Sequence, residues 1–331
     1  MEENLKNDES ISQVVDADSI KVDNGIPTVS NNEKKPKKKK RLTLAQKEAL
    51  TGWAFVTPVM IGFLVFTVFS MLYSLYISFT DWNMLKDPKW VGFSNYKNLF
   101  TKDLFFWDYL GNTIYYVIVL VPVVLVVSLT FAILLNKKVK GMTTFYRACL
   151  FLPCVVSTVA VSLVWTWIFN SSEGMLNSIL IRLGVSNPPG WLSTPGMAKN
   201  SIIIMRVWQM SGYYMVMFLT GLQTIPEVLY EAAEVDGASK LQKLWYITIP
   251  LLRPTTFAIT IFLVLEAFNI FEIVLIMTQG RMDTSSLMYY IYTLAFENYR
   301  MGYASALAWI LFIIILGFTI LRFTTKKEEK M

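Results

Sequence analysis

The sequence predicts an all-α integral membrane protein with six transmembrane helices. Three observations support this fold class: 54% of the 331 residues are hydrophobic, only 16% are charged, and long apolar runs alternate with polar connections. The mean hydropathy is +0.45. A soluble domain of this length rarely carries so much apolar content, whereas a bundle of membrane helices requires it.

Residue types also limit the chemistry. The chain has no histidine, so the commonest general base and metal ligand is missing. Cys149 and Cys154 lie in an apolar stretch, where small buried hydrophobes are expected rather than a metal site or a disulfide. We therefore expect no catalytic residues, no metal and no cofactor, and a chain that is not an enzyme.

Residues 1–49 are expected to form a disordered cytoplasmic tail, because residues 1–33 are polar and acidic with almost no aromatics. The tail ends near a basic block, "KKPKKKKR" (34–41). A nucleic-acid patch would have this composition, but its position beside an apolar run favours contact with anionic headgroups of the lipid bilayer. We expect no nucleic-acid partner, and the start of the chain lacks the pattern of a cleavable signal peptide.

A transmembrane helix needs about 20 largely apolar residues to cross roughly 30 Å of hydrocarbon. Helices are the open-chain structure that satisfies its own backbone in lipid, and the runs are too long for barrel strands. The six qualifying stretches lie near 52–79, 113–135, 148–169, 201–223, 255–278 and 304–322. They make up a predicted membrane domain over 50–325, followed by a short cytoplasmic C-terminal tail over 326–331.

Orientation follows from the basic residues between the spans, since cytoplasmic loops are enriched in Lys and Arg. With the amino terminus inside, the inside segments hold 34–41, Lys137, Lys138, Lys140, Arg147, Lys240, Lys243, Arg253, Lys326 and Lys327. Both termini are therefore predicted to be cytoplasmic. The outside loops, at 80–112, 170–200 and 279–303, are long enough to hold short helices and to meet a partner.

The loop at 224–254 is unusually ordered for a connection between two spans. Residues 227–240 favour helix, Gly237 permits a bend, and 239–248 form a second short amphipathic segment that Pro250 ends. An interfacial helix on the lipid is the simplest alternative. The acids of the loop weaken it, because anionic headgroups would repel them. A rigid cytoplasmic docking element is better supported.

The residues of this loop carry a family resemblance. "EAAEVDG" (231–237) followed by "ITIP" (247–250) resembles the EAA loop of permease subunits from bacterial ABC importers, with Ile249 in place of the usual leucine. The resemblance covers roughly residues 50–325 and is similar to the carbohydrate branch, for maltose-type oligosaccharides and glycerol phosphate. "TQGRMDTSS" (278–286) departs from that branch, which has a threonine followed by a Gly-Gly-Pro turn; only Gly280 remains.

The resemblance implies the type I ABC importer permease fold in a bacterial cell (inner or plasma) membrane. It implies a second related permease subunit, a cytoplasmic ABC ATPase dimer that receives the EAA loops, and an extracytoplasmic sugar-binding protein that delivers a carbohydrate substrate. The chain has no Gly-rich loop ending in Lys-Ser/Thr, so ATP hydrolysis is expected in other subunits.

Five residues are the predicted ATPase-coupling residues. Glu231 would supply charge, Ala232 and Ala233 would allow close packing, and Gly237 would set the bend. Asp236 belongs to the same group, although a role as a local cap or ion-pair partner is nearly as well supported.

Polar residues inside a span are candidates for the substrate pathway, because burying them in lipid is costly. Glu266, Asn269 and Glu272 are spaced by three in the fifth span and are predicted to share one helical stripe. Trp208 and Tyr213 of the fourth span could offer aromatic faces to a sugar. Packing at a subunit interface explains the same residues about equally well.

Three alternatives to a sugar-importing permease remain at this point. The first is an ABC permease for an amino acid, osmolyte or oligopeptide, which the flanking sequence disfavours. The second is an ATP-independent secondary transporter, which would place ionisable residues in several spans. The third, a membrane enzyme, is the weakest because no nucleophile–base pair is present.

Overall fold

The computed structural model describes residues 43–136 and 142–328 of the chain. Most of the predicted tail, its basic block and Lys137, Lys138 and Lys140 lie outside the described residues. The chain divides into two compact units, residues 1–63 and 64–331. In the first unit, α1 (Leu44–Gly62) exposes large apolar side chains such as Trp53 and Phe55, as expected of a helix that faces lipid or another subunit.

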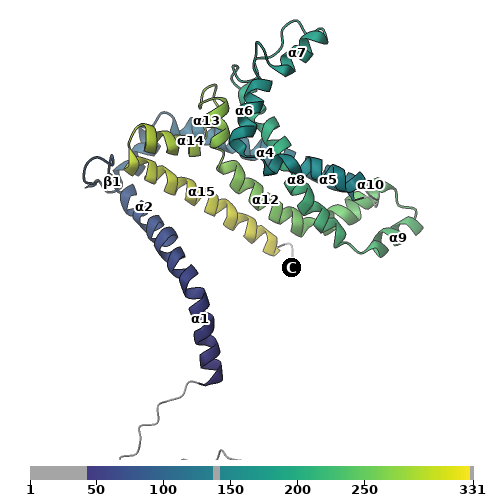
Figure 1. Cartoon of the computed structure of the whole chain (residues 1–331), viewed down its shortest axis with the longest axis horizontal. Coiled ribbons are helices and arrows are strands. Elements are labelled where there is room, and N and C mark those ends of the chain that lie inside the picture. Colours follow the sequence, from purple (N-terminus) through teal and green to yellow (C-terminus); the bar gives the residue numbers. More distant parts are fainter. Residues whose placement is uncertain (1–42, 137–141, 329–331) are drawn as a thin grey trace, which may run out of the picture. The chain divides into compact units, whose positions relative to one another are not determined.

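The larger unit is built almost entirely of helices (Figure 1). Its helices are α2 (Ser70–Ser78), α3 (Ser94–Thr101), α4 (Phe106–Leu135), α5 (Met142–Val155), α6 (Thr158–Ile168), α7 (Met175–Arg182), α8 (Met197–Gln223), α9 (Glu227–Val235), α10 (Lys240–Lys243), α11 (Ile249–Leu251), α12 (Arg253–Phe268), α13 (Glu272–Met277), α14 (Leu287–Tyr292) and α15 (Met301–Glu328). Three π-helical segments are η2 (Phe63–Phe69), η3 (Leu244–Thr248) and η4 (Thr293–Glu297). A two-residue antiparallel ribbon pairs β1 (Thr80–Asp81) with β2 (Lys89–Trp90).

The membrane spans agree with the predicted number when two bent pairs each count as one span. Four single stretches are long and apolar enough to cross a bilayer: Lys47–Ser78, Phe106–Leu135, Met197–Gln223 and Met301–Thr324. The bent pairs are Thr143–Val155 with Thr158–Ile168, at 98°, and Lys240–Leu251 with Arg253–Phe268, at 67°. The short helices α3, α7 and α14 occupy the three predicted outside loops.

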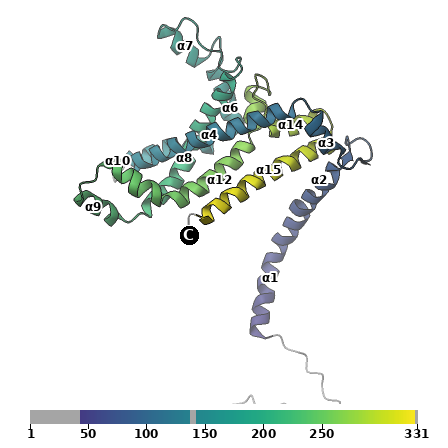
Figure 2. The same cartoon turned by 180° about the vertical axis from the view of Figure 1, so that it is seen from behind.

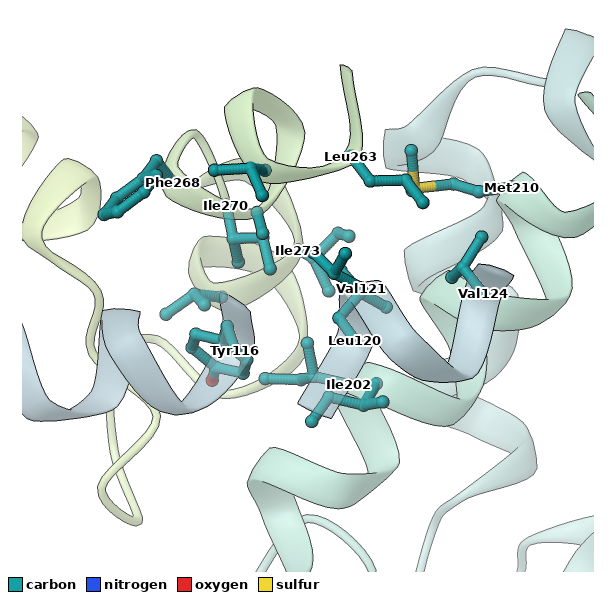
Figure 3. Close-up of a cluster of buried hydrophobic side chains, with 14 of the residues drawn as sticks. Tyr116, Leu120, Val121, Val124, Ile202, Met210, Leu263, Phe268, Ile270 and Ile273 are labelled. Carbon is teal, nitrogen blue, oxygen red and sulfur yellow. The ribbon is translucent and has the colours of Figure 1, made fainter. Parts of the chain in front are cut away.

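The core of the larger unit lies where α4, α8 and α12 pack together (Figure 3). Tyr116 and Leu120 from α4, Ile202 from α8 and Leu263 from α12 are fully buried or nearly so. Seen from behind in Figure 2, α4, α8 and α12 run along one another, with α9 and α10 at one end and α14 at the other. The connection from α8 to α9 and the start of α12 therefore lie at the same end of the bundle.

The fifth predicted span, 255–278, is not one helix. The helix α12 ends at Phe268, α13 begins at Glu272, and Phe271 between them has φ −138° and ψ −62°. The predicted continuous stripe of Glu266, Asn269 and Glu272 is therefore wrong. The break is stabilised from outside the span, because the Ser286 hydroxyl donates a hydrogen bond to the carbonyl of Ile270.

The turn after α13 is held by polar side chains of α4. Asn112 donates to the Ser285 carbonyl at 3.0 Å, and Tyr116 donates to the Thr284 carbonyl at 2.9 Å. The backbone amide of Leu287 donates to Thr113 at 2.9 Å. Within the divergent "TQGRMDTSS" sequence, Gly280 is in the left-handed region, with φ +70°.

An aspartate joins three segments at the same end of the bundle. One carboxylate oxygen of Asp103 accepts from Tyr290 at 2.8 Å and from Tyr303 at 2.7 Å. Its other oxygen accepts from the backbone amides of Phe105 and Phe106 at the start of α4. The loop before α4 is thereby tied to α14 and α15.

One close approach between helices requires a glycine. A Cβ atom added at Gly212 in α8 would lie 1.8 Å from the carbonyl oxygen of Leu150 in α5. We expect Gly212→Ala to lower the free energy of unfolding by about 1–3 kcal/mol, because the two backbones would have to separate. Thermal unfolding in detergent measures the effect.

The matched control is Gly317→Ala in α15, where an added Cβ meets no atom within 4 Å. That change is expected to be neutral or stabilising by about 0.5–1 kcal/mol through helix propensity. Equal effects of the two substitutions would contradict the close contact between α5 and α8.

Candidate functional site

The first candidate site is the loop that connects α8 to α12. Its helix α9 starts directly after Pro226 and ends in two backbone bonds typical of a glycine-capped terminus. The amide of Ala238 donates to the Ala233 carbonyl at 2.8 Å, and the amide of Gly237 donates to the Glu234 carbonyl at 3.0 Å. Gly237 has φ +78°, a conformation that L side chains rarely adopt.

The second half of the loop starts with a capping box. The Ser239 hydroxyl accepts from the amide of Gln242 at 3.3 Å, and the side chain of Gln242 accepts from the amide of Ser239 at 2.7 Å. The two halves are joined by an ion pair between Lys243 and Glu234 at 2.5 Å. The hydrogen bond from Lys243 holds the pKa of Glu234 below its usual range.

The predicted coupling residues lie on this loop as expected. Glu231, Ala232, Asp236 and Gly237 are exposed, and Ala233 is half-buried. No described side chain of α9 is buried. Large apolar side chains beside them are also exposed, among them Val235, Leu241, Trp245 and Tyr246. The loop is thus a rigid element with an uncovered surface, and the roles of its residues stay predictions.

The second candidate site is a cavity of about 690 Å³ in the larger unit. It opens between α5, α6, α8, α12 and the break that follows α12. Its lining comprises Cys154, Thr158, Arg206, Gln209, Met210, Tyr213, Tyr214, Phe262, Leu265, Glu266, Asn269, Ile270, Phe271, Glu272, Ile273 and Met288. The break between α12 and α13 contributes three residues in a row, so the irregular backbone shapes the wall.

An arginine organises one side of the cavity. Arg206 donates to Glu266 at 2.6 Å, which links α8 to α12, and to Gln209 at 2.8 Å. Gln209 in turn donates to Thr158 of α6 at 3.4 Å. The side chain of Arg206 is 14% exposed and that of Glu266 is 47% exposed. Paired, hydrogen-bonded charges are the form in which ionisable residues are tolerated at such depth.

Four of the five predicted pathway residues line this cavity: Glu266, Asn269, Glu272 and Tyr213. Trp208 does not; it lines a second cavity of about 490 Å³ with mainly apolar walls. Its ring is tilted by 58° against that of Trp165, with 5.5 Å between the ring centroids. The side-chain amide of Asn269 donates one hydrogen bond to the Leu265 carbonyl, at 2.8 Å. Whether these side chains contact a substrate remains a prediction.

Arg206, Gln209 and Thr158 were not among the site residues predicted from the sequence. The ionisable candidates predicted for the pathway, Glu266 and Glu272, are both in the fifth span, whereas Arg206 lies inside the fourth. The sequence signal was present, since an arginine within the apolar run at 201–223 is itself unusual. Its partner could not be identified from sequence, because Glu266 lies 60 residues away.

Helices long and apolar enough to cross a membrane, an exposed loop and a polar cavity are features expected of a membrane permease. The sequence profile of the family "Binding-protein-dependent transport system inner membrane component" matches residues 104–326, and the chain belongs to that family. The expected type I ABC importer permease fold is confirmed. The family places the chain in the inner membrane as a multi-pass transporter component, a class that is generally non-catalytic.

Individual proteins show the same likeness. The chain is 38% identical to the probable ABC transporter permease protein YesP of Bacillus subtilis, over 85% of this chain and 91% of the relative. It is 32% identical to the lactose transport system permease protein LacF of Rhizobium radiobacter, over 88% and 98%. A bacterial alginate ABC transporter, solved with an alginate pentasaccharide-bound periplasmic protein, has a chain of similar fold: TM-score 0.75, 22% identity, 83% and 93% coverage.

The ion pair between Arg206 and Glu266 is expected to stabilise the contact of α8 with α12. Glu266→Gln should lower the free energy of unfolding because the mostly buried Arg206 loses its counter-charge. In a double-mutant cycle with Arg206→Met we expect a coupling energy of about 1 kcal/mol, limited by solvent at the half-exposed glutamate. Thermal unfolding of the four purified proteins gives this value.

Glu272→Gln is the control for this cycle. In the part of the chain that the structure describes, Glu272 makes no ion pair, so its neutralisation should leave the unfolding temperature nearly unchanged. A coupling energy near zero would mean that the contact between Arg206 and Glu266 contributes nothing to stability.

Proposed function

We propose that the chain is the transmembrane permease subunit of an ATP-driven carbohydrate importer. In this proposal it forms half of the translocation pathway, beside a second related permease, and takes its energy from a cytoplasmic ATPase dimer. An extracytoplasmic sugar-binding protein delivers the substrate. The observation that carries the proposal is the rigid, uncovered loop of α9 and α10 in a chain of this family.

The carbohydrate assignment is supported by the relatives and by the cavity. LacF is named for lactose transport, and the structural neighbour is a transporter for alginate. In the cavity, side-chain amides and carboxylates stand beside the ring of Tyr213. Sugars are recognised by such a mixture of polar groups and apolar faces. Asn269, Glu272 and Glu266 are the proposed polar contacts.

The coupling assignment is supported by the shape of the loop. Its two halves are fixed by the glycine turn, the capping box and the ion pair of Glu234 with Lys243. The exposed Ala232 and the half-buried Ala233 on α9 have small side chains that would allow a partner's backbone to approach closely. Glu231, Asp236 and Gly237 complete the proposed ATPase contact.

The orientation of the chain follows from the same assignment. An ATPase partner is cytoplasmic, so the α9–α10 loop faces the cytoplasm, in agreement with the basic residues Lys240, Lys243 and Arg253 around it. With six spans, both termini are then cytoplasmic. The segment at 170–196 that contains α7 is accordingly extracytoplasmic, where the binding protein would meet the permease.

Gly237 offers a direct test of the coupling loop. Gly237→Pro should abolish retention of the ATPase subunit, because proline fixes φ near −65° and removes the amide that bonds Glu234. Gly237→Ala should weaken retention, since the left-handed conformation costs about 1–2 kcal/mol. Gly237→Asn should be tolerated best. The measurement is the ATPase copurified per permease, together with uptake.

Gly184 provides the matched control. It ends α7 with φ +91° and the same pair of backbone bonds, but lies on the side proposed to be outside. Gly184→Pro should therefore disturb an equivalent turn without loss of the ATPase. Normal uptake by a well-expressed Gly237→Pro variant would count against the coupling role.

The proposal as a whole is tested by affinity purification of the tagged chain from its native membrane in mild detergent. Mass spectrometry should find a second permease, an ABC ATPase and a binding protein, and one sugar should stimulate ATP hydrolysis. A chain that purifies alone and moves solute in liposomes without ATP would be a secondary transporter instead.

A further inference from the structure

The positive and negative side chains that line the 690 Å³ cavity are unequal in number. Among the described residues that line it, three carry charge: Arg206, Glu266 and Glu272. The first two form an ion pair at 2.6 Å and cancel. Glu272, at the start of α13, is exposed and has no ion-pair partner in the described part of the chain. One negative charge is left over.

Arg206, the cationic side chain among the described residues that line the cavity, already has hydrogen-bond partners. The two terminal nitrogens of Arg206 donate to Glu266 at 2.6 Å and to Gln209 at 2.8 Å, which fixes the guanidinium between α8 and its neighbours. Its Nε atom is buried without a hydrogen-bond partner, so it offers no exposed donor. Because Glu266 already neutralises the guanidinium, an acidic ligand that approached Arg206 would meet an ion pair rather than a free positive charge.

The remaining polar groups of the cavity suit an uncharged ligand. Asn269 is exposed and retains its side-chain oxygen and one amide hydrogen after bonding Leu265. Tyr213 is 48% exposed and packs edge-to-face with Tyr214. Hydroxyl groups can donate to Glu272 and Asn269 without any compensating charge.

We propose that this cavity selects its substrate by charge: it admits uncharged or basic saccharides and excludes saccharides that carry carboxylate or phosphate groups. Glu272 is the specificity-determining residue, because its charge is the uncompensated one. A lone charge in a concave site with low-dielectric walls repels anions and concentrates cations. This inference rests on the proposed function of the cavity as part of the sugar pathway.

The sign of the electrostatic potential in the cavity can be measured without knowledge of the substrate, because Cys154 lines the cavity. The only other cysteine, Cys149, lies on the wall of the second cavity and is removed as Cys149→Ala. The full chain and the purified complex are then treated at low salt with two methanethiosulfonate reagents of similar size, one cationic (trimethylammonium) and one anionic (sulfonate). The ratio of their rates reports the local potential, since any change in thiol ionisation affects both reagents equally.

The cationic reagent is expected to react faster, and Glu272→Gln should lower the rate ratio by a few fold, the effect expected when a charge that acts across a water-filled cavity is removed. Glu272→Asp, which keeps the charge, should restore the ratio, and Glu173→Gln, outside the cavity, should leave it unchanged. A rate ratio that Glu272→Gln leaves unchanged, or a faster reaction of Cys154 with the anionic reagent, would overturn the proposal.

The two proposals fail in different ways. If a sugar stimulates ATP hydrolysis but Glu272→Gln does not change the rate ratio, the importer assignment stands and the proposal of charge selection is wrong. Suppose that the rate ratio is as expected, but that digalacturonate stimulates ATP hydrolysis by the complex while lactose and maltose do not. That outcome would overturn the preference for uncharged or basic saccharides. The expected ratio with no response to any saccharide would remove the sugar pathway on which the inference rests.

Discussion

The structure depends on one constraint: backbone groups inside a bilayer need hydrogen-bond partners within the protein. The six stretches counted as spans meet it with helices, two of them bent. The chain between α12 and α13 leaves the helix, and side chains from elsewhere supply the missing partners. Ser286 bonds the Ile270 carbonyl, and α4 bonds the turn that follows through Asn112 and Tyr116.

That break decides where the cavity lies. Irregular backbone at membrane depth is tolerated where it is buried in protein or lines a water-filled space, and residues 269–272 do line the polar cavity. Despite the three-residue interruption, Glu272 lines the same cavity as Glu266. In a straight helix the two residues would have lain on one face through their spacing alone. The pathway role of these residues therefore stays a prediction, although the continuous helical stripe on which it was based is wrong.

Much of the fold could be predicted from sequence because lipid imposes a simple rule on length and polarity. The runs at 113–135 and 201–223 correspond to α4 and α8, each longer by a turn or two at its start. The loop of α9 and α10 was also predictable, since Gly237, Ser239 and Gln242 act through neighbours close in sequence. Local rules of capping and left-handed glycine suffice there.

What could not be predicted depends on contacts between distant segments. No proline or glycine marks residues 269–271, so the break is dictated by tertiary hydrogen bonds rather than by local preference. The same holds for the pairing of Arg206 with Glu266 and of Gln209 with Thr158, which form only once α8 packs against α12 and α6. Trp208 was misplaced for a related reason: the rotation of α8 about its axis was not fixed by the sequence, and its indole faces the apolar cavity instead.

The loop and the cavity are mechanically connected because they share the same two helices. Three residues separate the end of α8 from the start of α9, and the chain passes from α10 through η3 and α11 directly into α12. Tyr230 of α9 and Thr248 of η3 also share a hydrogen bond at 2.9 Å, so the loop responds as one body. A force applied to that body must act on α8 and α12, the helices that Arg206 and Glu266 join across the cavity wall. In the proposed pathway, this ion pair is the point at which movement of the loop would first change the shape of the polar cavity, because it links the two helices that the loop connects.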